Sequence, residues 1–115
     1  MREILFRGKR IETGEWVYGN PFVSDADART YILYGSRRVT IDWEVDPSTV
    51  GQYTGMMDKN GNRIFEGDIL SIWNESHDVV VFEDGAFDLE NTSIPIRFAN
   101  KFEVIGNITD NPELL

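Results

Sequence analysis

The sequence contains no cysteine and only one histidine, His77. The lack of cysteine excludes disulfides, thiolate zinc sites, iron–sulfur clusters and a cysteine nucleophile. Long hydrophobic runs are also absent near the start, where MREILFRGKR flanks a short apolar patch with charges. That patch is far shorter than the apolar segment of a signal peptide or the roughly 20 residues of a membrane span. We therefore expect a soluble, cytoplasmic protein that has no membrane partner.

Positive charge is scarce, since 11 Lys and Arg face 20 Asp and Glu, for a net charge of −9. The imbalance is uneven: residues 1–40 hold seven basic and five acidic side chains, whereas residues 41–115 hold four and fifteen. Nucleic-acid binding usually requires Lys and Arg clustered on one face. The composition disfavours such a partner and is typical of a solvated acidic surface.

Helical periodicity is nearly missing from this chain of 115 residues. Apolar residues alternate or form short runs, and turn residues interrupt them too often for an ordinary helix of about ten residues. The pattern predicts an all-β fold with little helix, in a single domain spanning 1–115. The expected strands are Ile4–Arg7, Trp16–Tyr18, Thr30–Tyr34, Val39–Trp43, Arg63–Phe65, Asp68–Trp73, Asp78–Phe82, Ala86–Leu89 and Phe102–Ile108.

Glycine-containing turns separate these strands. Asp84-Gly85 predicts a tight hairpin, because glycine enters the positive-φ conformations that such turns need. Asn60-Gly61 predicts a second turn, and Gly14 a third. Asp46–Thr49, in which proline follows an N-cap aspartate, could form one helical turn. Ser93–Asn100 is compatible with a loop or a short helix.

The second half of the chain has the cadence of a small closed or half-open barrel. Glu66–Leu70 leads into an apolar strand, and further short strands follow at close spacing. Strand alternation predicts which side chains point inward. The expected inward positions are Ile69, Ile72 or Trp73, Val79, Val81, Phe87, Leu89, Val104 and Ile108.

The run from Gln52 to Leu70, QYTGMMDKNGNRIFEGDIL, resembles the YopX family of small proteins from phages and prophages. The opening MREILFRG and the close FEVIGNITDNPELL are similar to the ends of that family. Met56-Met57 and the segment 22–38 depart from its pattern. The resemblance implies a phage or prophage origin, N-terminal strands over about 1–45 and an SH3-like barrel over about 52–109. It supplies no catalytic residues.

Two patterns suggest chemistry but lack essential parts. Ser76-His77-Asp78 are adjacent, whereas a catalytic triad converges from separate segments and neighbouring strand residues point to opposite faces. Asp58, Asn60 and Asn62 match the first ligand positions of a calcium-binding EF-hand loop. That loop also needs glycine at its sixth position and glutamate at its twelfth, where this chain has Arg63 and Ile69. We predict no catalytic residue, metal or cofactor.

Two surfaces are candidates for binding. Acidic and aromatic residues of the middle of the chain could form an interaction surface, although Glu66, Asp68, Glu83 and Asp84 have no spacing that requires them to converge. Basic residues could form a patch that, with exposed aromatics, binds single strands. The first surface comprises Trp43, Tyr53, Asp58, Asn60, Glu66, Asp68, Glu83 and Asp84. The second comprises Arg7, Lys9, Arg10, Arg37 and Arg38.

Together these features favour a non-enzymatic accessory protein that binds another protein or itself in a bacterial cytoplasm. The charge difference between the two parts of the chain would suit head-to-tail or symmetric self-association. The alternative is a nucleic-acid-associated protein, either a single-strand binder or an acidic mimic of DNA.

Overall fold

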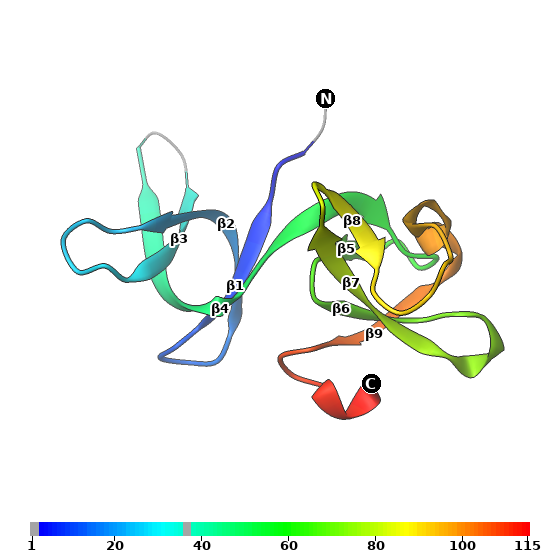
Figure 1. Cartoon of the computed structure of the whole chain (residues 1–115). Helices are drawn as coiled ribbons and strands as arrows, with labels where there is room; N and C mark the ends of the chain where they lie inside the picture. The colour runs from blue at the N-terminus through cyan, green and yellow to red at the C-terminus, as the bar shows by residue number, and fades with distance from the viewer. Residues whose placement is uncertain (1–2, 36–37) are drawn as a thin grey trace. The chain divides into compact units, whose positions relative to one another are not determined.

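The computed structural model describes residues 3–35 and 38–115. Within them the chain forms strands and three short 3-10 turns, which confirms the all-β prediction (Figure 1). It divides into two compact units, Met1–Gln52 and Tyr53–Leu115. No helix in the described part of the chain is long and apolar enough to cross a membrane.

The N-terminal unit is a closed ring of four antiparallel strands. β1 pairs with β2, β2 with β3, β3 with β4, and β4 returns to β1. Closure leaves none of these strands as a bare edge, which reduces the tendency to aggregate. The strands are β1 (Phe6–Arg10), β2 (Trp16–Val23), β3 (Thr30–Gly35) and β4 (Thr40–Met57).

β4 corrects two expectations. It is one long strand of 18 residues, where the sequence suggested a strand ending at Trp43 and then a helical turn at Asp46–Thr49. Asp46–Thr49 forms a bulge instead, because the pairing with β1 shifts register between Arg7 and Lys9. The Asp46 carboxylate accepts the backbone N–H of Ser48 at 3.0 Å, and the Lys9 N–H donates to the Thr49 hydroxyl at 2.9 Å. Side chains thus satisfy backbone groups that a helical turn would have paired.

The core of the N-terminal unit is small. Val17, Ile32 and Val45 are buried together, and Phe6, Trp43 and Val50 pack against them. Gly19 of β2 lies close to β3, so an added Cβ would come within 2.2 Å of the Leu33 carbonyl oxygen. Only glycine permits this approach of the two strands.

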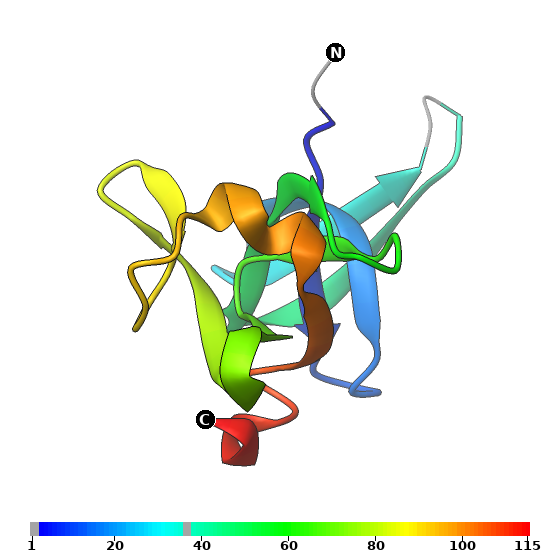
Figure 2. The same ribbon diagram turned by 90° about the vertical axis from the view of Figure 1, so that its right-hand side faces the viewer.

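The C-terminal unit contains the end of β4 and a four-stranded antiparallel sheet in the order β8-β7-β6-β9. A 3-10 turn, η2, precedes the last strand, and Figure 2 shows it in orange, crossing the strands of this unit. The spacing of the sequence predicted a small barrel in this half of the chain, and the strand pairs described here form this sheet. Its elements are β5 (Arg63–Phe65), β6 (Asp68–Ser71), η1 (Trp73–Glu75), β7 (His77–Glu83), β8 (Ala86–Leu89), η2 (Ile96–Lys101), β9 (Glu103–Asn107) and η3 (Pro112–Leu114).

The core of the C-terminal unit agrees only in part with strand alternation. Leu70 and Val80 are fully buried although alternation placed them outside. A bulge between Ile69 and Leu70 in the pairing with β9, and the packing of η2 on the sheet, bury both positions. Trp73 is 51% exposed because β6 ends at Ser71. Of the expected inward positions, Ile69, Ile72, Val79 and Leu89 are buried, Val81, Phe87 and Val104 are half-buried, and Ile108 is exposed.

The predicted turns are confirmed. Asp84 and Gly85 have φ of 52° and 81°, and they connect the paired residues Glu83 and Ala86 of β7 and β8. Two positive φ values are the mark of a type I′ hairpin turn. Asn60-Gly61 joins β4 to β5, and Gly14 reverses the chain between β1 and β2. Ser93–Asn100, which was ambiguous, contributes residues to η2.

Candidate protein-interaction surface

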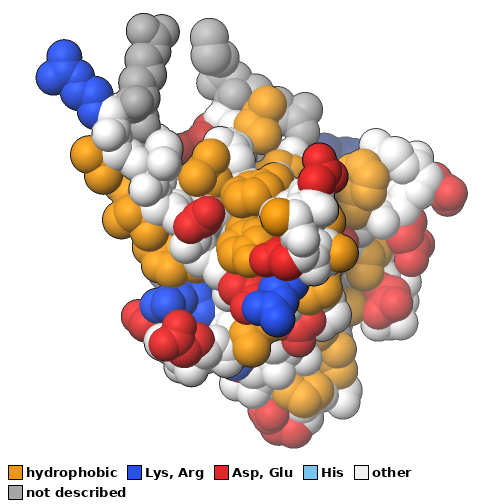
Figure 3. Space-filling view, turned by 90° about the vertical axis from the view of Figure 1, so that its left-hand side faces the viewer, with side chains coloured by type: hydrophobic (Ala, Val, Ile, Leu, Met, Phe, Trp, Pro, Cys, Tyr) orange, Lys and Arg blue, Asp and Glu red, His pale blue; other side chains and the backbone are white. Residues whose placement is uncertain are grey.

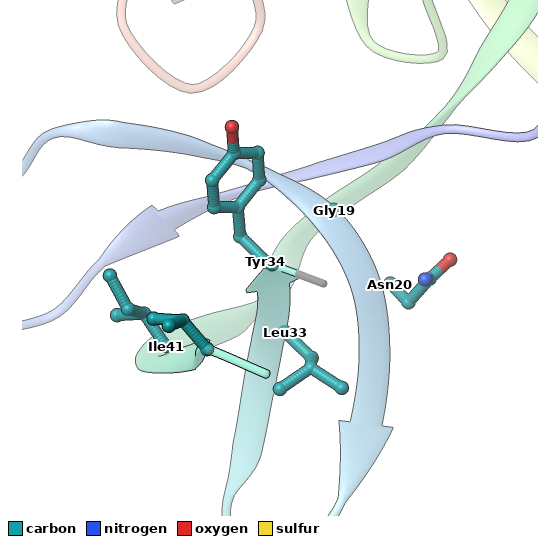
Figure 4. Close-up of a pocket in the computed structure, with 7 residues that line it drawn as sticks. Gly19, Asn20, Leu33, Tyr34 and Ile41 are labelled. Atoms are coloured by element: carbon teal, nitrogen blue, oxygen red, sulfur yellow. The ribbon is translucent and has the colours of Figure 1, made fainter. Parts of the chain in front are cut away.

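The N-terminal unit carries a hollow of about 500 Å³. This volume falls in the range of sites that hold small ligands or the side chains of a partner. Figure 4 shows Tyr34 and Ile41 on one side of it and Leu33 and Asn20 on the other. The hollow is lined by Gly19, Asn20, Leu33, Tyr34, Gly35, Val39 and Ile41.

The register of β3 and β4 explains why apolar side chains lie exposed here. Tyr34 is opposite Ile41, and Ile32 is opposite Trp43. Paired residues two positions apart share a face of a sheet. Ile32 reaches the core, whereas Tyr34 and Ile41 lie beyond its end and remain 59% and 47% exposed. Tyr34 and Ile41 therefore continue the core face of β3 and β4 past the buried residues, and both line the hollow.

Neighbouring side chains hold this surface in place. The ring of Tyr34 lies 6.1 Å from that of Trp43, which is half-buried against the core. Val39, the residue before β4, is 65% exposed. Figure 3 shows hydrophobic side chains gathered on the face it presents, with acidic and basic side chains among them. A supported, contiguous apolar surface of this kind commonly marks a binding site.

The expected interaction surface of the middle segment is wrong for three of its residues. Tyr53, Asp58 and Asp68 are buried, with 5%, 5% and 2% exposure. Tyr53 packs on Phe65 with ring centroids 5.6 Å apart. The Asp68 carboxylate accepts the backbone N–H of Phe65 at 2.7 Å. These groups contribute to the interior of the C-terminal unit and cannot form an exposed rim.

Asp58 is the first residue of the calcium-like pattern, but its carboxylate accepts hydrogen bonds from backbone N–H groups. One carboxylate oxygen accepts the N–H groups of Asn60 and Asn62 at 2.9 and 2.8 Å. The other accepts the N–H of Val104 at 2.9 Å, and so joins the β4–β5 turn to β9. Burial raises the pKa of Asp58, but the N–H donors of Val104, Asn62 and Asn60 outweigh it and lower the pKa below its ordinary value. In the described residues no three His, Asp or Glu side chains gather as metal ligands.

The remaining members of that expected surface lie in separate places. Trp43 is half-buried in the N-terminal unit, and Glu66 is half-buried before β6. Asn60 is exposed in the β4–β5 turn and donates to Glu103 at 3.2 Å. Glu83 and Asp84 are exposed at the tip of the β7–β8 hairpin. Only these last two adjoin each other.

The expected basic patch is wrong for Arg7. This side chain is buried, and its guanidinium lies 4.7 Å from the centroid of the Trp16 ring. Arg10 is paired with Glu12 and Glu15, each at 3.6 Å. Lys9 is half-buried and Arg38 is exposed, while Arg37 lies outside the described residues.

His77 and Asp78 have structural partners. The Nδ1 atom of His77 lies 3.0 Å from the carbonyl oxygen of Leu114, so Nδ1 is the donor. Asp78 is fully buried and accepts the N–H of Val79 at 2.8 Å and the side-chain amide of Asn91 at 3.0 Å. Sequence reasoning did not single out Asp78 as a buried residue, because nothing in its surroundings separates it from exposed carboxylates.

The hollow was also missed from the sequence. Tyr34, Val39 and Ile41 read as ordinary strand residues, and their exposure depends on where the core ends. The sequence signal for the hollow is the presence of apolar residues on both arms of a predicted hairpin. To use that signal, one must know which residues of the two strands pair.

Comparisons with known proteins agree with the resemblance seen in the sequence. The chain is similar over its full length to protein EF1440 from Enterococcus faecalis, whose crystal structure it matches with 26% identity and a TM-score of 0.67, covering 99% of that chain. No curated protein matches. The model of the YopX family, described as YopX protein, matches residues 5–115. The chain therefore belongs to the YopX family.

Proposed function

We propose that the protein is a non-enzymatic accessory protein of a phage or prophage, which acts by binding protein through the hollow of its N-terminal unit. The observation that carries this proposal is the exposure of Tyr34, Val39 and Ile41 around a cavity of about 500 Å³. Covering these side chains would remove apolar area from water, at about 25 cal/mol per Å².

The composition of the hollow favours binding over acid–base chemistry. Among the residues that the structure describes, the seven that line it include neither a carboxylate nor a histidine, lysine or arginine. Asn20 and the backbone offer hydrogen bonds that could orient a bound segment, while Leu33 and Ile41 supply apolar walls. A mostly apolar site with few polar groups is typical of ligand and peptide recognition.

Binding of single-stranded nucleic acid has less support. Arg7 is buried on Trp16, and Arg10 is neutralised by two glutamates. A single-strand site needs exposed positive charge next to exposed aromatic faces. The pairing of these arginines weakens the electrostatic part of such a site.

Affinity capture from a bacterial host lysate tests the proposal. The bait proteins are the wild type, Ile41→Asp, and Ile11→Asp as a control. Ile11 is 60% exposed in the same unit but is not part of the hollow, so both variants add one charge at an exposed isoleucine. We expect a protein retained by the wild type and by Ile11→Asp to be lost with Ile41→Asp, while circular dichroism shows all three folded. Equal retention by all three baits would contradict the proposal.

A further inference from the structure

The β7–β8 hairpin continues the buried face of its sheet toward the turn. Val80 and Leu89 are opposite each other and buried, and two positions further along Phe82 is opposite Phe87. Paired residues two positions apart share a face of a sheet. Phe82 is nevertheless 47% exposed, and Phe87 is half-buried. We call these two phenylalanines the aromatic pair.

The aromatic pair leaves ring faces open. The two rings meet edge-to-face, with centroids 5.0 Å apart and 69° between their planes. In this arrangement the edge of one ring covers one face of the other, and the remaining faces have no neighbour within the pair. The face of an aromatic ring attracts cations. The chain uses this contact elsewhere, since guanidinium groups lie over the rings of Trp16, Tyr53 and Phe98 at 4.7, 5.6 and 5.0 Å from their centroids.

Negative charge surrounds the aromatic pair. Residues 64–96 contain eight Asp and Glu but no Lys or Arg. Four of these carboxylates, on Glu83, Asp84, Asp88 and Glu90, are exposed. Within the described residues no Lys or Arg forms an ion pair with any of the four.

These carboxylates are close enough to act on a cation at the rings. Alternation places Glu83 and Asp88 on the face of the hairpin opposite to the aromatic pair, so they attract the cation through their field and not through direct contact. Successive Cα atoms are about 3.8 Å apart, which is well inside the Debye length of about 10 Å at 0.1 M salt.

We propose that the aromatic pair is a docking surface for an arginine-bearing segment of another protein, with a guanidinium group on the ring of Phe82. A guanidinium is planar, weakly hydrated and stacks on aromatic faces, whereas the ammonium of lysine is a strongly hydrated point charge. The C-terminal unit, with twelve acidic and four basic residues, has a net charge of −8 that steers a basic partner toward it. This surface is separate from the hollow and goes beyond the proposed function.

A second copy of this chain does not match the surface. Its N-terminal unit, with eight acidic and seven basic residues, has a net charge of −1, so both units are negative and copies repel each other. Arg10, Arg29 and Lys59 are paired with glutamates at 3.6, 3.6 and 3.8 Å. The complementary partner is therefore a different, basic protein.

Fluorescence anisotropy with two labelled peptides tests this proposal on the full chain. One peptide alternates arginine and serine, and the other has lysine in place of arginine. We expect the wild type to bind the arginine peptide more tightly than the lysine peptide, and both less tightly as salt is added. Phe82→Ser, which removes the ring and no charge, should weaken binding of the arginine peptide by about threefold to thirtyfold, as for the loss of a cation–π contact.

The N-terminal unit supplies a matched control for the ring. Phe22 is 38% exposed and also belongs to an aromatic pair, with its ring centroid 5.4 Å from that of Tyr31. Phe22→Ser should bind both peptides like the wild type.

The charges have a matched control as well. Glu83→Gln combined with Asp84→Asn keeps the turn, because asparagine accepts positive φ, and should reduce both the affinity and its dependence on salt. Asp25→Asn combined with Asp42→Asn removes the same charge from exposed positions of the other unit and should have a smaller effect.

A further variant keeps the proposal testable if circular dichroism shows that Phe82→Ser does not fold. Phe82→Leu keeps an apolar side chain and removes the ring face, so it should abolish the preference for the arginine peptide over the lysine peptide.

Three outcomes would overturn the proposal: no binding of the arginine peptide at low salt, no dependence on the Phe82 ring, or equal losses in the two pairs of charge variants. The last result would show attraction by general acidity alone. Ile41→Asp should leave peptide binding unchanged, because Ile41 lines the hollow. The proposed function and this inference can therefore fail independently, and loss of peptide binding in Ile41→Asp would contradict a separate surface on the hairpin.

Discussion

Asp58, Asp68 and Asp78 lie buried in the C-terminal unit, although the sequence suggested a surface position for Asp58 and Asp68. The reason is that turns leave backbone N–H groups without a carbonyl partner, and a buried donor must find an acceptor. One carboxylate can accept several such bonds. The single carboxylate of Asp58, for example, accepts hydrogen bonds from the N–H groups of its own turn and of β9.

We predict that Asp58→Asn destabilises the protein by about 2–3 kcal/mol, as expected for the loss of hydrogen bonds to a buried charged group. The amide has the same shape, but its NH₂ group would face a backbone N–H, either that of Val104 or those of the turn. Urea unfolding followed by circular dichroism measures the effect. Glu90→Gln, at an exposed carboxylate, is the control and should cost less than 0.5 kcal/mol. Equal stabilities of the two variants would contradict the role of Asp58.

The stabilisation by Asp58 should depend on pH. Its pKa is lowered in the folded protein, so near pH 4 the unfolded chain binds more protons than the native state. The contribution is therefore complete above the unfolded pKa of about 3.9 and is lost as the pH falls through the lower native pKa. We predict that the difference in unfolding free energy between wild type and Asp58→Asn is constant from pH 7 to about pH 5 and shrinks on further acidification. A difference that stays constant down to pH 2.5 would contradict this assignment.

At the scale of elements, local turn chemistry was predictable and strand continuity was not. Asp84-Gly85 specifies its hairpin because the two residues tolerate positive φ, whatever surrounds them. Asp46–Thr49 reads locally as a helix start, yet it lies in β4. Pairing with β1 decides the conformation of that segment, since it supplies hydrogen bonds that one isolated helical turn cannot match.

The hairpin turn can be tested at Gly85. Its φ is 81°, and no atom lies within 4 Å of an added Cβ, so substitution tests backbone conformation alone. We predict that Gly85→Ala costs about 1–2 kcal/mol, because an L-residue pays this for the left-handed conformation. Gly85→Asn should cost less, since asparagine adopts that conformation more readily. Thermal unfolding would compare them, and similar losses for both variants would indicate a cause other than φ.

At the scale of the whole molecule, the described part of the chain has two separate hydrophobic clusters. One centres on Ile32 and Val45, and the other on Leu70, Val80 and Phe102. Stability in such a chain need not be uniform, because regions with their own cores can open separately.

We predict that Leu70→Ala reduces protection from hydrogen exchange mainly in 53–115, with a loss of about 2–5 kcal/mol as for a buried leucine. Ile32→Ala should reduce protection from hydrogen exchange mainly at the backbone amides of residues 3–35. Hydrogen exchange followed by mass spectrometry measures both. An equal loss of protection along the whole chain in each variant would show that the two units unfold together.

The sequence by itself determined the strand-rich fold, the glycine turns and the family, because alternation of apolar residues and positive-φ positions act over a few neighbouring residues. Only the tertiary structure decided which aspartates are buried and where apolar side chains remain exposed. Tyr34 and Ile41 are no different in type from Ile32 and Val45, but they lie beyond the end of the small core. Burial depends on which strands pair and in what register, and those contacts join residues that are far apart in the chain.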